Sequence, residues 1–293
     1  MRGARVKLLR TTAAVGVLLL VAAACSKSST PEAGGSPEAS GSMMPSESMM
    51  ASGASDEMMM QPGAEKMHVS IASPSPGFVL TANTLDLKVD VSGYKDTCDY
   101  AGTEDREGIG HYHVLLDGSL INMFCTPKAQ ISMQNVSPGQ HMIEVVPAQD
   151  DHTEIMDNAV EMPFTYKPSN PLPEIGAAAT SGQPAIKILE PSDGATLSGP
   201  FTVKVAFTNF NSSCDLLGKP DVAGYGHWHV NIDSMSGPMM GMGTMLGMAC
   251  TDTFTGTTVG MDPGSTHTMF ALLVDNGHAP LDVFDKIDFT VGS

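Results

Sequence analysis

Hydrophobic and polar residues alternate with period two over much of the chain after residue 66. In "TLDLKVDV", Leu85, Leu87 and Val89 fall on one face of an extended strand, while Asp86 and Lys88 fall on the other. Further strand candidates in the same unit are "MHVSI", "HYHVLLDG", "QHMIEVV" and "EMPFTY". Because turn signals separate these runs and no long stretch has a helical period, the pattern predicts several short strands.

The same kind of pattern returns from residue 185 onward. Its strand candidates are "AIKILE", "FTVKVAF", "GHWHVNID", "HTMFALLVD" and "KIDFTV". Residues 168–184 are rich in proline, glycine and alanine, which indicates a linker. We therefore expect an all-β protein with two tandem immunoglobulin-like β-sandwich domains, at residues 66–167 and 185–293.

The first 65 residues have a different pattern. Basic residues precede the apolar stretch "AAVGVLLLVAAA", which is too short for a comfortable membrane span and indicates an export signal. The following "VAAAC" resembles the lipobox of bacterial lipoproteins, with Ala22 where the family usually has leucine. The resemblance implies a signal peptide at 1–24, lipid modification (palmitate included) of Cys25, and a membrane-anchored, extracytoplasmic location in a bacterial cell envelope. Residues 25–65 contain small polar residues without an apolar period, which predicts a disordered tether.

The composition narrows the set of partners. The chain has 32 acidic and 15 basic side chains and a formal net charge of −17. Such a surface repels the phosphates of nucleic acids, so nucleic-acid binding is excluded from the candidate functions.

Eight of the nine histidines form two sets with matching order along the chain. "GHYHVLLDG" and "GHWHVNID" each contain His-x-His; "SPGQH" and "DPGSTH" each end in histidine; and a further histidine follows 11 positions later in both units. The first set is His111, His113, His141 and His152; the second is His227, His229, His267 and His278. The chain therefore contains an internal repeat.

Four cysteines remain when Cys25 is set aside, and an exported protein can keep them as disulfides. Four cysteines allow three pairings. The first cysteine of each unit lies 13 positions before its His-x-His, and the second lies between that motif and the Pro-Gly turn. The repeat therefore favours Cys98–Cys125 and Cys214–Cys250.

The repeated motifs resemble a poorly characterised bacterial envelope module that combines Gly-His-x-His, Pro-Gly-x-His and a loop Asp/Asn-x-His. The matches are "GHYHVLLDG", "PGQH" and "DDH" in the first unit, and "GHWHVNID", "PGSTH" and "DNGH" in the second. The extra residue in "PGSTH" departs from the pattern at His267. The resemblance implies an Ig-like fold and an envelope location, and the family has no settled function.

Strand alternation gives the histidines a metal-binding interpretation. Residues two apart share a face, so His111 and His113 lie together, opposite Tyr112 and Val114, which are expected in the core. The same holds for the second His-x-His. His141 and His267 begin strands, and His152 and His278 follow the ends of those strands. One or two of them per unit could join the pair, giving a site of three or four imidazoles. Imidazole suits Cu(II), Zn(II) and Ni(II).

Methionine favours copper among these metals, because thioether sulfur selects Cu(I). The tether contains "MMPSESMM" and "DEMMM", and the second unit contains "GPMMGMGTMLGM". These segments resemble the methionine-rich segments of exported copper-handling proteins. Secondary ligands expected in the second unit are Met239, Met240, Met242, Met245 and Met248.

The leading hypothesis is an envelope lipoprotein that binds copper, or alternatively zinc, through a histidine cluster in each domain. The alternative is a non-catalytic module for protein or glycan contact, in which the histidines form hydrogen bonds to the backbone. The sequence lacks Gly-x-Ser-x-Gly, Walker and His-Glu-x-x-His motifs, so we do not expect an enzyme.

Overall fold

The computed structural model describes residues 61–235 and 243–293. The predictions for the signal peptide, Cys25, most of the tether, and Met239, Met240 and Met242 lie outside these residues. No helix in the described ranges is long and apolar enough to cross a membrane.

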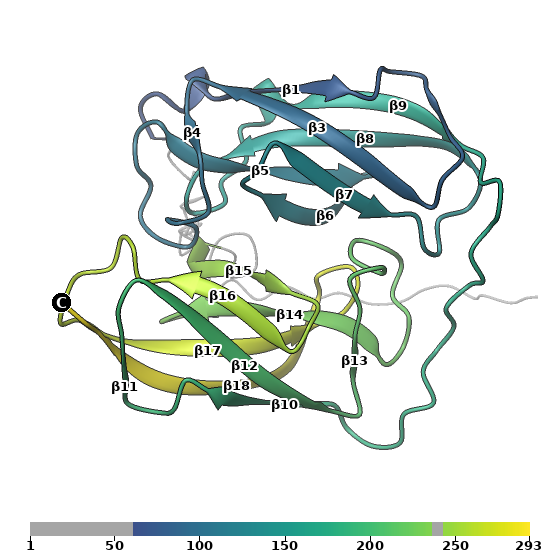
Figure 1. Ribbon diagram of the computed structural model, residues 1–293. Helices are drawn as coiled ribbons and strands as arrows, with labels where there is room; N and C mark the ends of the chain where they lie inside the picture. The colour runs from purple at the N-terminus through teal and green to yellow at the C-terminus, as the bar shows by residue number, and fades with distance from the viewer. Residues whose placement is uncertain (1–60, 236–242) are drawn as a thin grey trace, which may run out of the picture. The chain divides into compact units, whose positions relative to one another are not determined.

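The first sandwich, coloured blue to teal in Figure 1, is built from two sheets. The smaller sheet has the strand order β1 (His68–Ser73), β3 (Thr84–Ser92), β7 (Lys128–Ser132). The larger has the order β2 (Val79–Leu80), β9 (Val160–Tyr166), β8 (Gly139–Ala148), β5 (Ile109–Leu116), β4 (Lys95–Asp96), with β6 (Ser119–Phe124) also paired to β5. Two short 3₁₀ turns flank these strands, η1 (Ala64–Lys66) and η2 (Met156–Asn158).

The second sandwich, coloured green to yellow in Figure 1, repeats this topology. The smaller sheet has the order β10 (Ala185–Glu190), β12 (Pro200–Thr208), β16 (Thr253–Thr257). The larger has the order β11 (Ala195–Leu197), β18 (Pro280–Val291), β17 (Thr266–Val274), β14 (Tyr225–Ile232), β13 (Asn211–Ser212), with β15 (Met245–Ala249) also paired to β14. The fold predicted from the alternating pattern, two Ig-like sandwiches, is confirmed.

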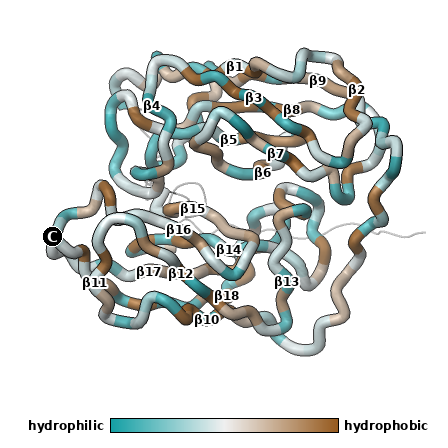
Figure 2. Tube along the Cα trace, in the orientation of Figure 1, coloured by the Kyte–Doolittle hydropathy of each residue, from teal (hydrophilic) through white to brown (hydrophobic). Residues whose placement is uncertain are grey.

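Each core lies between the inward faces of its two sheets. Along β3, every second residue is buried, and Figure 2 shows apolar and polar positions interleaved along the strands. On the His-x-His strands, Tyr112 and Val114 of β5 and Trp228 and Val230 of β14 are fully buried in the two cores. An aromatic residue at the centre of this strand is also a feature of immunoglobulin domains. These core residues fix the opposite face of β5 and β14 as the histidine face.

Both predicted disulfides are present, Cys98–Cys125 and Cys214–Cys250. Each joins the segment before the His-x-His strand to the end of the strand that forms a hairpin with it, β6 or β15. The bonds therefore tie the edge of the larger sheet to the segment that precedes the histidines. Two disulfides indicate a protein that folds outside the reducing cytoplasm.

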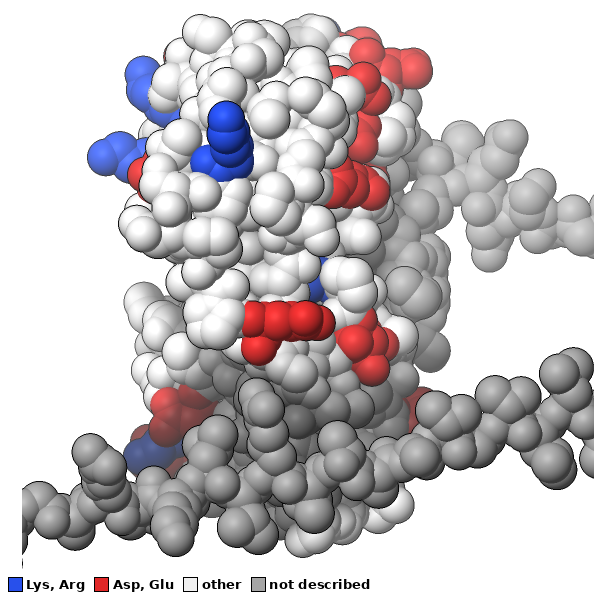
Figure 3. Space-filling view, turned by 90° about the vertical axis from the view of Figure 1, so that its right-hand side faces the viewer, with Lys and Arg blue, Asp and Glu red and all other residues white. Residues whose placement is uncertain are grey.

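Charged side chains lie on the surface in separate groups. Figure 3 shows acidic side chains gathered along one side of the first sandwich and basic ones on the other side of the same view.

Candidate metal centres

Three histidines of each repeat converge. In the first sandwich they are His111 and His113 of β5 and His152 of the loop after β8, and in the second His227, His229 and His278. We call these sets the first triad and the second triad. The register explains the convergence: His111 lies opposite Ala148 near the end of β8, and His227 lies opposite Val274 at the end of β17. The loops that follow these two strand ends carry the third histidine back over the pair.

The third histidine is held by a tight turn with left-handed backbone geometry. His152 has φ 67° and His278 has φ 69°, values that non-glycine residues rarely adopt. Different side chains stabilise the two turns. The Asp151 carboxylate accepts hydrogen bonds from the backbone N–H and the hydroxyl of Thr153 in one. In the other, the Asp275 carboxylate accepts bonds from two backbone N–H groups. In both repeats, hydrogen bonds to a nearby aspartate therefore hold the third histidine in the same uncommon backbone geometry.

The ring nitrogens of the first triad lie at distances that suit a shared metal ion. His111 Nε2 lies 3.1 Å from His113 Nε2 and 3.1 Å from His152 Nδ1, and the remaining pair is 3.4 Å apart. The corresponding distances in the second triad are 3.0, 3.0 and 3.5 Å. Nitrogens bound to one tetrahedral ion at about 2.0–2.1 Å stand about 3.3 Å apart, so both triads match a three-histidine site.

Hydrogen bonding on the outer side of the rings leaves lone pairs facing inward. The second nitrogen of His152, Nε2, donates to the Met245 carbonyl oxygen at 2.7 Å, because a carbonyl can only accept. His113 Nδ1 lies 2.7 Å from Glu154 Oε1 and donates to this carboxylate. Both inner nitrogens, 3.4 Å apart, are therefore unprotonated acceptors in the neutral rings. A neutral His111 has one proton, so its Nε2 can donate to only one of these two acceptors at a time. With that proton on Nδ1, all three inner nitrogens present lone pairs that a metal ion could accept.

The second triad has the same arrangement with one difference. His278 Nε2 donates to the Leu120 carbonyl oxygen at 2.8 Å, which leaves Nδ1 as an acceptor. The position that corresponds to Glu154 is occupied by Pro280. Among the described residues, this carboxylate partner is present in the first triad and not in the second; it orients a ligand ring and raises its basicity.

The two outer bonds cross between the sandwiches in a reciprocal manner. His152 of the first sandwich donates to Met245 of β15, and His278 of the second donates to Leu120 of β6. Met245 and Leu120 occupy equivalent register positions, opposite Asn231 and Leu115. Each triad is thus completed by a backbone carbonyl of the other sandwich.

Burial favours the neutral form of five of the six triad imidazoles. His111 and His227 are fully buried, and desolvation, with the neighbouring imidazoles of the same triad, holds their pKa values well below the usual range. Burial lowers the pKa of His152 to about 3 and that of His229 to about 3, and it also lowers the pKa of His278. Neutral imidazole is the form that binds a metal ion.

Of the three or four imidazoles expected at each site, three converge; His141 and His267 are corrected as candidate ligands because they lie at the other ends of their strands. His141 Nδ1 bonds Asp117 Oδ2 at 2.7 Å, and its Nε2 donates to the Ser137 carbonyl. His267 Nδ1 bonds Asp233 Oδ2 at 2.7 Å. Both rings therefore bond groups of the turns beside their strands and lie outside the triads.

The prediction that the His-x-His pairs lie opposite the core is confirmed, although these faces are not open to solvent. His113 is 1% exposed and His229 is 6% exposed. Sequence reasoning also missed Glu154, which reaches His113 because the chain turns back after β8 and Glu154 forms an antiparallel bridge with Ala148.

Comparison with known proteins gives no family. No family model matches the chain, and no curated protein matches it. Solved structures share weak likeness. The fibronectin(III)-like modules of Clostridium thermocellum CbhA are 14% identical, with 76% of this chain and 94% of that chain covered and a TM-score of 0.25. The BSP domain structure of a biofilm-associated protein is 12% identical over 76% of this chain and 30% of that chain, with a TM-score of 0.22.

A putative membrane-anchored protein from Corynebacterium diphtheriae is 9% identical, with 78% of this chain and 59% of that chain covered and a TM-score of 0.21. The class of protein is therefore defined by the chain's own strand order and side chains. It is an Ig-like two-sandwich protein with two disulfides and two buried histidine triads that could each hold a metal ion.

Proposed function

We propose that the protein is a membrane-anchored, extracytoplasmic lipoprotein that binds copper, or alternatively zinc, in its two histidine triads. The observation that carries the proposal is the inward-facing nitrogen geometry, 3.0–3.5 Å in the second triad and 3.1–3.4 Å in the first. The lipobox at Cys25 supports anchoring in a bacterial envelope, and the disulfides support the oxidising location.

Burial favours metal binding over recognition of a protein or glycan by the histidines. The least buried member of either triad, His278, is only 7% exposed, so the six rings offer little surface to a partner. Three histidines in each triad also leave one coordination position for water or another ligand, because tetrahedral ions take four. No side chain beside them forms a nucleophile–base pair in the described residues, and we propose binding, delivery or storage of the ion without turnover.

Isothermal titration of the chelator-treated protein with Cu(II), and separately with Zn(II), tests this function. We expect two ions per chain for the wild type, and none at the triads for the double variant His152→Asn/His278→Asn. Asparagine is chosen because it tolerates the left-handed backbone at these positions.

The matched control is His141→Asn/His267→Asn, which makes the same chemical change outside the triads and should retain both ions. Equal binding by the wild type and His152→Asn/His278→Asn would overturn the proposed function.

A further inference from the structure

Three methionines from the two sandwiches lie together beside the triads. Met123 of β6 and Met245 of β15 are buried in one apolar cluster with Ala101, and Met248 of β15 packs against it. Met123 is 8% exposed and Met245 is fully buried. The cluster therefore brings thioether sulfurs from both sandwiches to one place.

The strand register places two of these methionines next to triad histidines. Met123 lies directly opposite His113, and Met248 lies directly opposite His229. Directly paired residues of antiparallel strands point to the same face, with Cβ atoms about 5 Å apart. Met123 and Met248 thus project on the histidine face of their sheets. The sequence repeats the arrangement, since "MFCT" and "MACT" place each methionine two residues before a disulfide cysteine.

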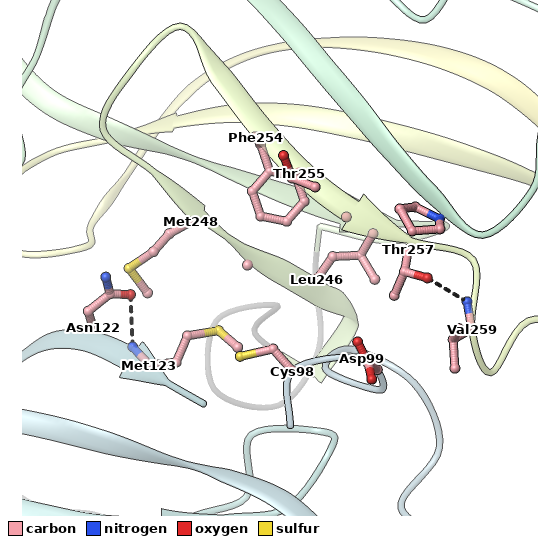
Figure 4. A pocket seen from close by; sticks show the side chains of 13 residues that line it. Cys98, Asp99, Asn122, Met123, Leu246, Met248, Phe254, Thr255, Thr257 and Val259 are labelled. Atoms are coloured by element: carbon pink, nitrogen blue, oxygen red, sulfur yellow. Dashed lines mark hydrogen bonds between the residues drawn. The ribbon is translucent and has the colours of Figure 1, made fainter. Parts of the chain in front are cut away.

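A cavity of about 530 Å³ lies at this cluster, and its lining includes Met123, Met248, Asn122, Asp99 and Phe254. Figure 4 shows the Met123 and Met248 side chains at the same end of the cavity, near Cys98. The cysteine sulfurs are engaged in disulfides, so the thioethers are the soft donors available there. An ion that enters the cavity meets these sulfurs next to the strands that carry His113 and His229.

The repeat does not require methionine at the position of Met245. Leu120 occupies the equivalent register position in the first sandwich, so the fold accepts a branched apolar side chain there. Leucine and methionine have similar volumes and exchange at small cost in apolar surroundings. What methionine adds is a polarizable thioether, and neutral thioether ligands select Cu(I).

We infer that Met123, Met245 and Met248 form a Cu(I) site between the two sandwiches, distinct from the histidine triads and adjacent to both. This inference rests on the proposed copper function and gives the protein a separate place for the cuprous ion. It adds Met123, from the first repeat, to the methionines that the second repeat contributes.

The test uses the full-length protein in detergent, pre-loaded with Zn(II) to occupy the triads, and titrated with Cu(I) under anaerobic conditions against a chromophoric Cu(I) chelator. The triple variant Met123→Leu/Met245→Leu/Met248→Leu should lose one equivalent of chelator-resistant Cu(I) relative to the wild type. The matched control is Met162→Leu, a methionine buried in the first core, which should lose none. Methionines of the tether are present in all three proteins and cancel in the comparison.

Full Cu(I) retention by the folded triple variant would overturn the inference, while Zn(II) binding at the triads would leave the proposed function intact. Conversely, absence of Zn(II) and Cu(II) binding in the wild type counts against the proposed function alone. Should the triple variant fail to fold, X-ray absorption of the Zn(II)-loaded wild type with one Cu(I) decides the question. Several sulfur neighbours around copper support the site, and a shell of nitrogen or oxygen alone contradicts it.

Discussion

Loading the chelator-treated protein with Cu(II) or Zn(II) should raise its free energy of unfolding by about 4 kcal/mol for each triad, at a free-metal concentration roughly a thousand times the dissociation constant. The reason is that the triads exist only in the folded chain. Two members of each come from one strand and the third from a loop 39 or more positions away. Urea denaturation with and without metal, at fixed protein concentration, measures the change.

The reciprocal carbonyl bonds should spread this stabilisation over both sandwiches. An ion on His152 Nδ1 fixes the ring whose Nε2 bonds Met245 of the other sandwich, and His278 does the same toward Leu120. We therefore expect the two sandwiches of the metal-loaded protein to unfold in one transition. The His152→Asn/His278→Asn variant should show the same unfolding curve with and without metal. A wild-type curve that metal leaves unchanged would contradict the triad interpretation.

The second large effect is loss of stability of the metal-free protein in mild acid. Burial lowers the pKa of five triad histidines in the folded chain, to about 3 for His152 and His229. Unfolded histidine titrates near 6.5, so below that pH the unfolded chain binds protons that the folded chain does not. Stability should therefore fall as pH decreases from 7 to 5, by about 2 kcal/mol for each histidine whose folded pKa is about 3, as for His152 and His229.

Buried carboxyls oppose part of this trend. Desolvation raises the pKa of Asp96 to about 6 and that of Asp150 to about 7, so the folded chain takes up these protons before the unfolded chain does. Burial also raises the pKa of Asp105 and of Glu144. These carboxyls stabilise the fold as pH falls, and we expect them to offset part of the effect of the five histidines. Urea denaturation at pH 7 and pH 5 measures the net change. His152→Asn/His278→Asn should show a shallower dependence, and a wild type that is equally stable at both pH values would refute this account.

Much of the architecture was predictable because its signals are local. Period-two alternation along β3 and β12 determines which of their residues are buried. The repeated spacings of cysteine and histidine allowed both disulfides and the internal repeat to be predicted from the sequence. The histidine face followed from the same alternation, since Tyr112 and Trp228 could only belong to the cores.

Predicting which histidines form the triads required the lengths of the strands as well as the spacing of the histidines in the sequence. His141 stands seven positions before Ala148, which pairs with His111. Seven residues of a strand span about 23 Å, so His141 and the loop residue His152 cannot both reach the pair. The burial of the triads could not be predicted from local sequence patterns, because residues of the other sandwich contact each triad. The Met123 signal was present in the repeated "MFCT" and "MACT", but its importance depends on the pairing of β6 with β5.

The most direct test of the central claim is a crystal structure of the metal-loaded protein, with data collected above and below the absorption edge of the metal. Our account predicts one anomalous peak in each triad, about 2.0–2.1 Å from His111 Nε2, His113 Nε2 and His152 Nδ1 in the first. The second peak should have the same relation to His227, His229 and His278. Anomalous peaks confined to other parts of the molecule, with the six imidazoles bonded only to one another and to protein groups, would contradict it.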